Sequence, residues 1–368
     1  MHCVALLPLL ASLGTIAAAA PAATDADIIV NSFQLYPENA DYDFKRKLLH
    51  FGYGSHLTRL VWCNKTDSYS ALYNSSVATY SPSKNTIEKI TEFPPLTNDS
   101  FYHASGVKVD PFTDRLSVII NPGAAWTNGG QDISGDTWLI KVDLKTGLEL
   151  WRSNLTTALD GKYGGYQDVA HDAAGNSYVI GTFPGSILKV DPSGETVTPW
   201  YASDETTTTV TGFTGIVYLG TKFLTTYGKN GLVQRWNSCD GQGKPTTVPV
   251  KTAGTPPKTD AVLENIEAIT LPKKHKGEVL LVASNTKGVY VLRSKDGWDS
   301  AENLGEIPNK YSESGGVVVT TVQVEDRLYA VLEYFNDIKN PVPETVAGNR
   351  TEFPLQDITS AVDELLKK

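Results

Sequence analysis

The amino-acid sequence predicts an all-β fold: a six-bladed β-propeller of four-stranded blades with a short C-terminal helix. The first observation is a repeat. Five segments alternate apolar and polar residues and then run into a turn, and their first apolar residues are Val77, Leu139, Ile187, Leu232 and Val289. These residues are 62, 48, 45 and 57 positions apart, and a period near 50 residues is typical of propeller blades. The second observation is a hairpin-like pair of β-rich runs before each segment, as in residues 106–120.

The blades are expected in chain order, because one such sheet cannot bury both faces alone whereas a ring of sheets can. The repeats lie near residues 36–95, 103–155, 164–201, 211–250 and 264–308. A sixth repeat begins near Ser314 and lacks sequence for its last strand, which we expect residues 27–35 to supply. Closing the ring with this N-terminal strand would leave no open sheet edge.

The remaining segments complete the domain plan. We expect one propeller domain over residues 21–339, and a linker with a C-terminal helix over residues 340–368. The helix is predicted because Ile358, Val362, Leu365 and Leu366 follow a roughly helical spacing.

The N-terminus resembles a secretory signal. Residues 3–20 are almost wholly apolar or small, and Ala18-Ala19-Ala20 before Pro21 offers a cleavage context. A membrane anchor is the alternative, but the stretch is short and rich in alanine, and no other segment is apolar enough to span a bilayer. We therefore predict a signal peptide over residues 1–20, no stable membrane span, and a secreted protein or one in the lumen of the secretory pathway.

The amino-acid composition limits the kinds of molecule that the protein can bind. The chain has 368 residues, 40% of them hydrophobic, and a formal net charge of −9. The one basic run, residues 273–276, is most simply a solvated turn, so nucleic acid is excluded as a partner. We expect a monomer.

Covalent modification follows from the predicted secretory route. Five glycosylation sequons are present, at Asn64, Asn74, Asn98, Asn154 and Asn349. Cys3 would leave with the signal, so Cys63 and Cys239 remain as either one disulfide between distant blades or two buried thiols.

Candidate site residues follow from blade geometry, because the loop before the first strand and the loop joining strands two and three open on the same face. The long segment from Asn121 to Asp136 is either a binding lid or an ordered surface loop with Trp126 tucked into the rim. The polar and aromatic residues predicted to bind substrate at these positions are Tyr102, Trp126, Tyr163, Tyr166, Gln167, Phe183, Phe213 and Asn265.

Three titratable residues are candidates for acid–base chemistry. Asp168 and Glu267 occupy matching positions before first strands, and His103 has the same kind of position. Two carboxylates in a dry pocket divide acid and base roles when their pKa values are pushed apart. The alternative is that they accept hydrogen bonds from backbone amides between blades. His171 alternates with a strand valine and is expected to be a core histidine.

Several stretches resemble the fungal core trichothecene cluster protein fourteen family: residues 35–43, 73–80, 129–136, 161–169 and 181–191. The resemblance covers most of the mature chain. It implies a secreted-type fungal propeller encoded near secondary-metabolite genes and linked to toxin production and virulence. It also implies a ring-closing role on a pathway intermediate.

Three functions are therefore in competition. The first is a cofactor-free cyclase or isomerase that closes a ring on a small, apolar, oxygenated, terpenoid-like metabolite in fungal mycotoxin biosynthesis. The second, by analogy with gluconolactonase-like propellers, is a lactonase or esterase with Ca²⁺ held by Glu267, Asn285, Asn121 and Asp168, since hard cations prefer oxygen ligands. The third is a secreted binding or virulence protein without catalytic activity.

Overall fold

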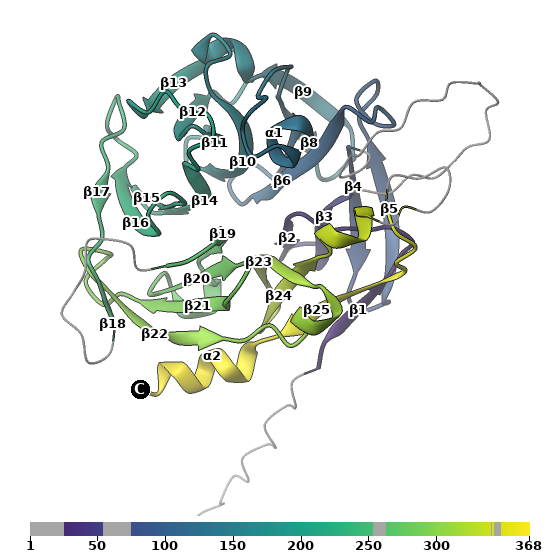
Figure 1. Cartoon of the computed structure of the whole chain (residues 1–368), viewed down its shortest axis with the longest axis vertical. Coiled ribbons are helices and arrows are strands. Elements are labelled where there is room, and N and C mark those ends of the chain that lie inside the picture. The colour runs from purple at the N-terminus through teal and green to yellow at the C-terminus, as the bar shows by residue number, and fades with distance from the viewer. Residues whose placement is uncertain (1–25, 54–74, 253–262, 340, 342–346) are drawn as a thin grey trace, which may run out of the picture.

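Six antiparallel sheets form a ring in the computed structural model, which describes residues 26–53, 75–252, 263–339, 341 and 347–368 (Figure 1). Each of the first three blades is a run of four consecutive strands. Blade 1 contains β2 (Ala40–Asp43), β3 (Leu48–Tyr53), β4 (Ser76–Ser81) and β5 (Thr86–Glu92). Blade 2 contains β6 (Tyr102–Asp110), β7 (Arg115–Pro122), β8 (Trp138–Asp143) and β9 (Glu149–Asn154). Blade 3 contains β10 (Gly164–His171), β11 (Ser177–Phe183), β12 (Ser186–Val190) and β13 (Val197–Ala202).

The later blades are less regular. Blade 4 contains β14 (Phe213–Leu219), β15 (Lys222–Tyr227), β16 (Leu232–Asn237) and β17 (Thr246–Thr247). Blade 5 contains β19 (Ile266–Thr270), β20 (Val279–Ser284), β21 (Gly288–Arg293) and β22 (Ala301–Ile307), and β18 (Val250–Thr252) adds a parallel fifth strand beside β22. Blade 6 contains β23 (Val317–Val324), β24 (Arg327–Glu333), β25 (Glu352–Asp357) and β1 (Ile28–Asn31). The predicted all-β six-bladed fold is confirmed.

The N-terminal strand closes the ring as predicted. β1 pairs antiparallel with β25, from Ile28 opposite Leu355 to Asn31 opposite Glu352. β25 itself was not foreseen, because it lies in the segment that the sequence suggested was a linker. Pro354 at its centre removes a backbone donor and disguises the strand, yet Phe353 and Leu355 are fully buried. The sixth blade therefore extends to Asp357.

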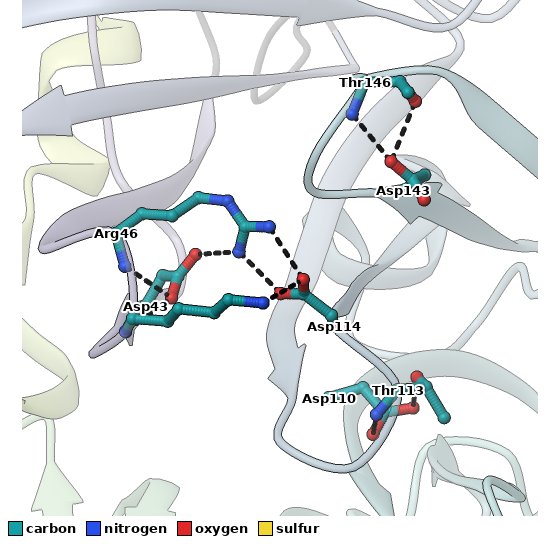
Figure 2. Close-up of polar contacts among 8 residues, drawn as sticks. Asp43, Arg46, Asp110, Thr113, Asp114, Asp143 and Thr146 are labelled. Atoms are coloured by element: carbon teal, nitrogen blue, oxygen red, sulfur yellow. Dashed lines mark hydrogen bonds and ion pairs between the residues drawn. The ribbon is translucent and has the colours of Figure 1, made fainter.

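The hairpin turns explain the repeat seen in the sequence. Asp110 accepts hydrogen bonds from the backbone amides of Phe112 and Thr113, and Asp143 accepts from the amide and hydroxyl of Thr146 (Figure 2). An aspartate at the end of a strand thus folds the chain back through an Asx turn. This geometry explains why valine-aspartate pairs followed by Ser, Thr and Gly recur along the chain.

Apolar clusters fill the spaces between neighbouring blades. Between blades 3 and 4, the rings of Tyr178, Trp200, Phe223 and Trp236 pack with centroids 4.3–6.0 Å apart. The predicted C-terminal helix is confirmed as α2 (Thr359–Leu366), which lies along the outside of the ring near β22 (Figure 1). Its Val362 is fully buried in the largest cluster.

Short helical turns occupy several connections. They are α1 (Ala124–Thr127), η1 (Thr156–Leu159), η2 (Lys273–His275), η3 (Ser312–Ser314) and η4 (Phe335–Lys339). None of the helices in the described ranges is both long and apolar enough to cross a bilayer.

Some sequence predictions fall outside these ranges: the signal peptide over residues 1–20, the sequons at Asn64 and Asn74, and Cys63. The sequon asparagines Asn98 and Asn349 are exposed, and Asn154 is half-buried at the end of β9. Cys239 is exposed, and its disulfide with Cys63 stays a prediction.

Candidate functional site

The ring has two faces with different chemistry. The innermost strand of each blade surrounds the centre of the ring (Figure 1). We call the face where these strands begin the start face, and the face where they end and turn into the second strands the hairpin face. The sequence predicted its site on the start face.

Glu267 lies on the start face at the beginning of blade 5, where its side chain contacts a residue of blade 3 that is 100 positions earlier in the chain. Its Oε2 accepts a hydrogen bond from Gln167 Nε2 at 2.8 Å, and its Oε1 accepts one from Asn285 Nδ2 at 2.7 Å. Gln167 lies in a β-bulge of β10, and Glu267 lies in a β-bulge of β19, a device that re-aims a side chain. Thr182 donates to Gln167 Oε1 at 3.1 Å and so fixes the orientation of the amide.

Glu38 lies near Glu267, and Glu333 lies near Glu38. Neither was among the predicted site residues. Burial and the charge of Glu267 raise the pKa of Glu38 to about 8. Burial, and then the charge of Glu38, raise the pKa of Glu333 well above its usual range. One oxygen of each, Oε2, is buried without a hydrogen-bond partner among the described residues. The missed signal was position: Glu38 precedes the first strand of blade 1, and Glu333 ends the second strand of blade 6.

The three carboxyl groups have unequal hydrogen bonding. Burial raises the pKa of Glu267, but its hydrogen bonds from Asn285 and Gln167 favour the ionised form. Glu38 accepts no hydrogen bond from the residues that the structure describes, so its neutral form is favoured near neutral pH. The start face therefore brings together a carboxyl group whose pKa is raised to about 8 and one whose two oxygens each accept a hydrogen bond from an amide.

His103 lies away from this cluster, beneath the long loop of blade 2. Trp126 on α1 packs against the His103 ring at 6.1 Å between centroids and against the edge of Phe183 at 5.2 Å. Burial lowers the pKa of His103 to about 4, and neither ring nitrogen has a partner among the described residues. Trp126 is thus tucked against its neighbours, and His103 is a neutral imidazole.

Asp168 has the surroundings of a structural carboxylate. It is fully buried, and it accepts hydrogen bonds from the amides of Val169 at 2.9 Å and of Ile216, in the next blade, at 3.2 Å. Lys108 Nζ lies 3.8 Å from its Oδ1. This is the alternative arrangement that the sequence left open, with a carboxylate joining two blades.

The remaining candidates lie apart from the carboxyl cluster. Tyr166 and Phe213 are fully buried in apolar clusters between blades. Tyr163 donates to the carbonyl of Ser203, and exposed Asn265 donates to Thr286. Tyr102 is half-buried, with its ring edge-on to Phe101 at 5.0 Å.

The four ligands of the predicted calcium site are not assembled as a set. Glu267 contacts Asn285, but both ends of the Asn121 amide are engaged elsewhere: it donates to the Tyr166 carbonyl and accepts from the Tyr166 amide. Asp168 is bound to backbone amides. Among the described residues, no group of three or more His, Cys, Asp or Glu side chains has a geometry that holds a metal.

The fold and this site define a class: six-bladed β-propellers whose centre is lined by carboxyl groups on one face. Residues 133–308 match the family described as Mal s 1 allergenic protein-like. The chain belongs to the family of core trichothecene cluster protein 14, as the resemblance in the sequence predicted. It is 31% identical to core trichothecene cluster (CTC) protein 14 of Fusarium sporotrichioides over 316 residues, 81% of this chain and 80% of the relative.

Two further comparisons agree. Trichothecene biosynthesis protein 14 of Trichoderma arundinaceum is 29% identical over 356 residues, which are 92% of this chain and 90% of the relative. The crystal structure of the major Malassezia sympodialis allergen Mala s 1 superposes with a TM-score of 0.71 at 20% identity, covering 90% of this chain and 95% of that one. This structural likeness supports the fold alone.

Proposed function

We propose that the protein takes part in mycotoxin biosynthesis as a cofactor-free cyclase or isomerase that closes a ring on an oxygenated, terpenoid-like intermediate. The names of the two fungal relatives support the biosynthetic role. The observation that carries the chemical proposal is the pairing of Glu38 with Glu267, because two nearby carboxyl groups with different surroundings can divide acid and base roles.

In the proposed reaction the substrate loses one proton to the protein and gains one proton from it. Glu267, as the carboxylate, removes a proton from a hydroxyl group of the substrate, and that oxygen bonds to an electrophilic carbon of the same molecule. The bond from that carbon to an epoxide oxygen of the substrate breaks, and Glu38, as the neutral acid, protonates that oxygen, which stays on the product as a hydroxyl group. Holding both ends of one molecule in reach contributes to the rate, since an oriented intramolecular reaction avoids the entropy cost of encounter.

The neighbouring amides have a supporting role in this proposal. Gln167 and Asn285 each donate to a different oxygen of Glu267, so they keep its carboxylate in one orientation. The same bonds limit the rise in its pKa that burial causes. We further propose that the protein works as a monomer, without a metal, in the secretory pathway or outside the cell.

The test begins with the substrate. Deleting the gene in its host should make an uncyclised isomer accumulate, and this isomer is the substrate for assays with purified protein. Glu267→Gln and Glu38→Gln should each lower kcat by about 10²–10⁴-fold, the usual contribution of general acid–base catalysis. Both changes keep side-chain size, so thermal unfolding midpoints should stay close to the wild-type value.

Controls separate chemistry from structure. Glu195→Gln, in an exposed turn of blade 3, should leave both kcat and the unfolding midpoint unchanged. Asp168→Asn should lower the unfolding midpoint, because Asp168 binds the amides of two blades. It should have little effect on kcat. Wild-type rates in both glutamate variants would overturn the acid–base assignment, and no turnover by the wild type would favour a binding protein. Loss of activity on chelation and rescue by Ca²⁺ would favour the lactonase.

A further inference from the structure

The hairpin face contains a cavity of about 670 Å³ that the proposed reaction does not use. It is lined by the ends of the innermost strands and by the turns that follow them, from five of the six blades. A volume of this size suits a small organic molecule, since ligand pockets commonly span about 300–1,000 Å³. The Gln167–Glu267 pair belongs to the opposite face, so this cavity is a separate site.

The carboxylates around this cavity are already engaged. Figure 2 shows Arg46 bridging Asp43 and Asp114 across two blades, at 2.6–2.9 Å. Asp110 accepts from turn amides and from Lys141, and Asp41 accepts from the amides of Tyr42 at 2.9 Å and Val109 at 2.8 Å. The cavity therefore offers few free acceptors.

Its hydrogen-bond donors are less engaged. Lys108 Nζ approaches Asp168 only at 3.8 Å, which is beyond hydrogen-bond distance. Lys273 Nζ lies 3.9 Å above the Phe44 ring. Neither ammonium group has a hydrogen-bond acceptor among the residues that the structure describes.

His171 supplies a third donor through a buried relay. Lys141 Nζ donates to Ser117 Oγ at 2.9 Å, and Ser117 Oγ lies 2.8 Å from His171 Nε2. Ser117 Oγ accepts from the Lys141 ammonium group, and its own proton is available for His171 Nε2. In the tautomer that accepts this proton, the neutral imidazole carries its own proton on Nδ1, which has no partner in the described part of the chain.

Aromatic side chains give the cavity an apolar side. Phe112 is 47% exposed, and its ring meets Tyr218 edge-on at 6.0 Å between centroids. Phe44 lies under Lys273 on the same cavity. Phe112 and Phe44 thus place two aromatic rings on the wall of the cavity beside its charged groups.

From donors that lack hydrogen-bond acceptors, engaged carboxylates and this aromatic side, we propose that the hairpin-face cavity binds a neutral, largely apolar molecule bearing a carbonyl or ether oxygen. Lys108 and the Nδ1–H of His171 would donate to that oxygen. A neutral acceptor fits better than an anion, because Asp41 and Asp168 lie beside Lys108 and would repel added negative charge. The proposal does not depend on the reaction assigned to the start face.

The test uses two volatile probes that share a carbon skeleton: nootkatone, a bicyclic ketone, and valencene, the corresponding hydrocarbon without the oxygen. Binding to the full-length protein is measured by equilibrium headspace gas chromatography. Nootkatone should bind the wild type more tightly than valencene. Lys108→Met should weaken the binding of nootkatone by about 10-fold, the usual effect of losing a hydrogen bond from a charged donor. The binding of valencene should be unchanged.

Two more variants keep the proposal falsifiable if Lys108→Met folds poorly. Phe112→Ala removes an exposed ring and should weaken the binding of both probes equally. Glu267→Gln on the opposite face should change the binding of neither probe. Nootkatone that binds Phe112→Ala and Lys108→Met as tightly as wild type would overturn the proposal, as would no binding to the wild type. Tighter binding of decanoate, measured by titration calorimetry and lost in Lys108→Met, would instead indicate an anionic ligand and also overturn the proposal.

Discussion

Glu333 on the start face and Asp110 on the hairpin face are both fully buried carboxyl groups, but their surroundings differ. Asp110 accepts from two backbone amides, from the Thr113 hydroxyl and from Lys141. Glu333 accepts only from the amide of Tyr334, and its Oε2 has no described partner. Hydrogen bonds therefore offset the desolvation cost of the buried Asp110 carboxylate on the hairpin face. They offset only part of this cost for Glu333 on the start face.

The difference follows from where each residue stands in a blade. A short aspartate at the end of a strand reaches the amides of its own turn, so the carboxylates of the hairpin face are hydrogen-bonded within their own turns. A longer glutamate at the start of a strand, or at the far corner of one, extends toward the centre, where other blades' carboxyl groups meet it. Position alone does not separate the two kinds of carboxyl group, because Asp168 in the first strand of blade 3 also accepts from backbone amides. Side-chain length and position act together.

Lys141→Met should have the largest effect on stability. The change removes the buried ammonium group that bonds Asp110, Ser117 and Ser177 at 2.9–3.3 Å. Losing one partner of a buried ion pair typically costs about 3–5 kcal/mol, and we expect that loss in the free energy of unfolding measured with denaturant. Lys84→Met removes an exposed ion pair with Glu88 and should cost no more than about 1 kcal/mol. Similar values for the two variants would mean that the buried ion pair of the hairpin face contributes no more to stability than an exposed one.

The pH dependence of catalysis tests the start face directly. Glu38, with its pKa raised to about 8, must be protonated to act as the acid, so kcat/KM should fall about tenfold per pH unit above that value. The acid limb should lie above the usual glutamate range, because burial raises the pKa of Glu267. Replacing Glu38 with Gln should remove the alkaline limb. An alkaline limb that persists in Glu38→Gln would assign it to another group.

Much of this architecture was predictable, and the exceptions have physical causes. The six blades and the closing strand follow from local alternation and turn residues, which act over a few positions. β25 was missed because Pro354 interrupts its pattern. Gln167 and Asp168 are adjacent, yet only Gln167 reaches Glu267, because the β-bulge between Tyr166 and Asp168 changes which side chain points inward. Sequence alternation alone does not reveal such a bulge.

Glu333→Gln tests whether the buried Glu333 carboxylate destabilises the folded protein because too few hydrogen bonds offset its desolvation. Because the pKa of Glu333 is raised in the folded protein, the folded state binds a proton that the unfolded state releases as pH rises. Wild-type stability should therefore fall between the ordinary glutamate range and alkaline pH. The glutamine variant should lack this fall and exceed wild type by about 1–3 kcal/mol at alkaline pH, the usual cost of an unsatisfied buried group. Parallel denaturant curves across pH measure the difference, and curves that do not diverge would contradict it.

Arg46→Lys should have the smallest effect and defines how the hairpin face uses charge. Arg46 donates to Asp43 at 2.8 Å and to both oxygens of Asp114 at 2.6 and 2.9 Å (Figure 2). Lysine keeps the charge but lacks the planar fork for two-point contact, so we expect a loss of about 1 kcal/mol in the free energy of unfolding near neutral pH.

The matched control is Lys45→Met. Lys45 contacts the same Asp114 at 2.6 Å, but its side chain is 70% exposed, so its loss should cost about 0–0.5 kcal/mol. Hydrogen bonds from Arg46 and then Lys45 hold the pKa of Asp114 well below its usual range, so its stabilising contribution is present at neutral pH and is lost only in strong acid. The gap between Arg46→Lys and wild type should therefore close in strong acid as Asp114 takes up its proton. A gap that does not change with pH would mean that the lysine variant disturbs the packing of the turn rather than its charge contacts.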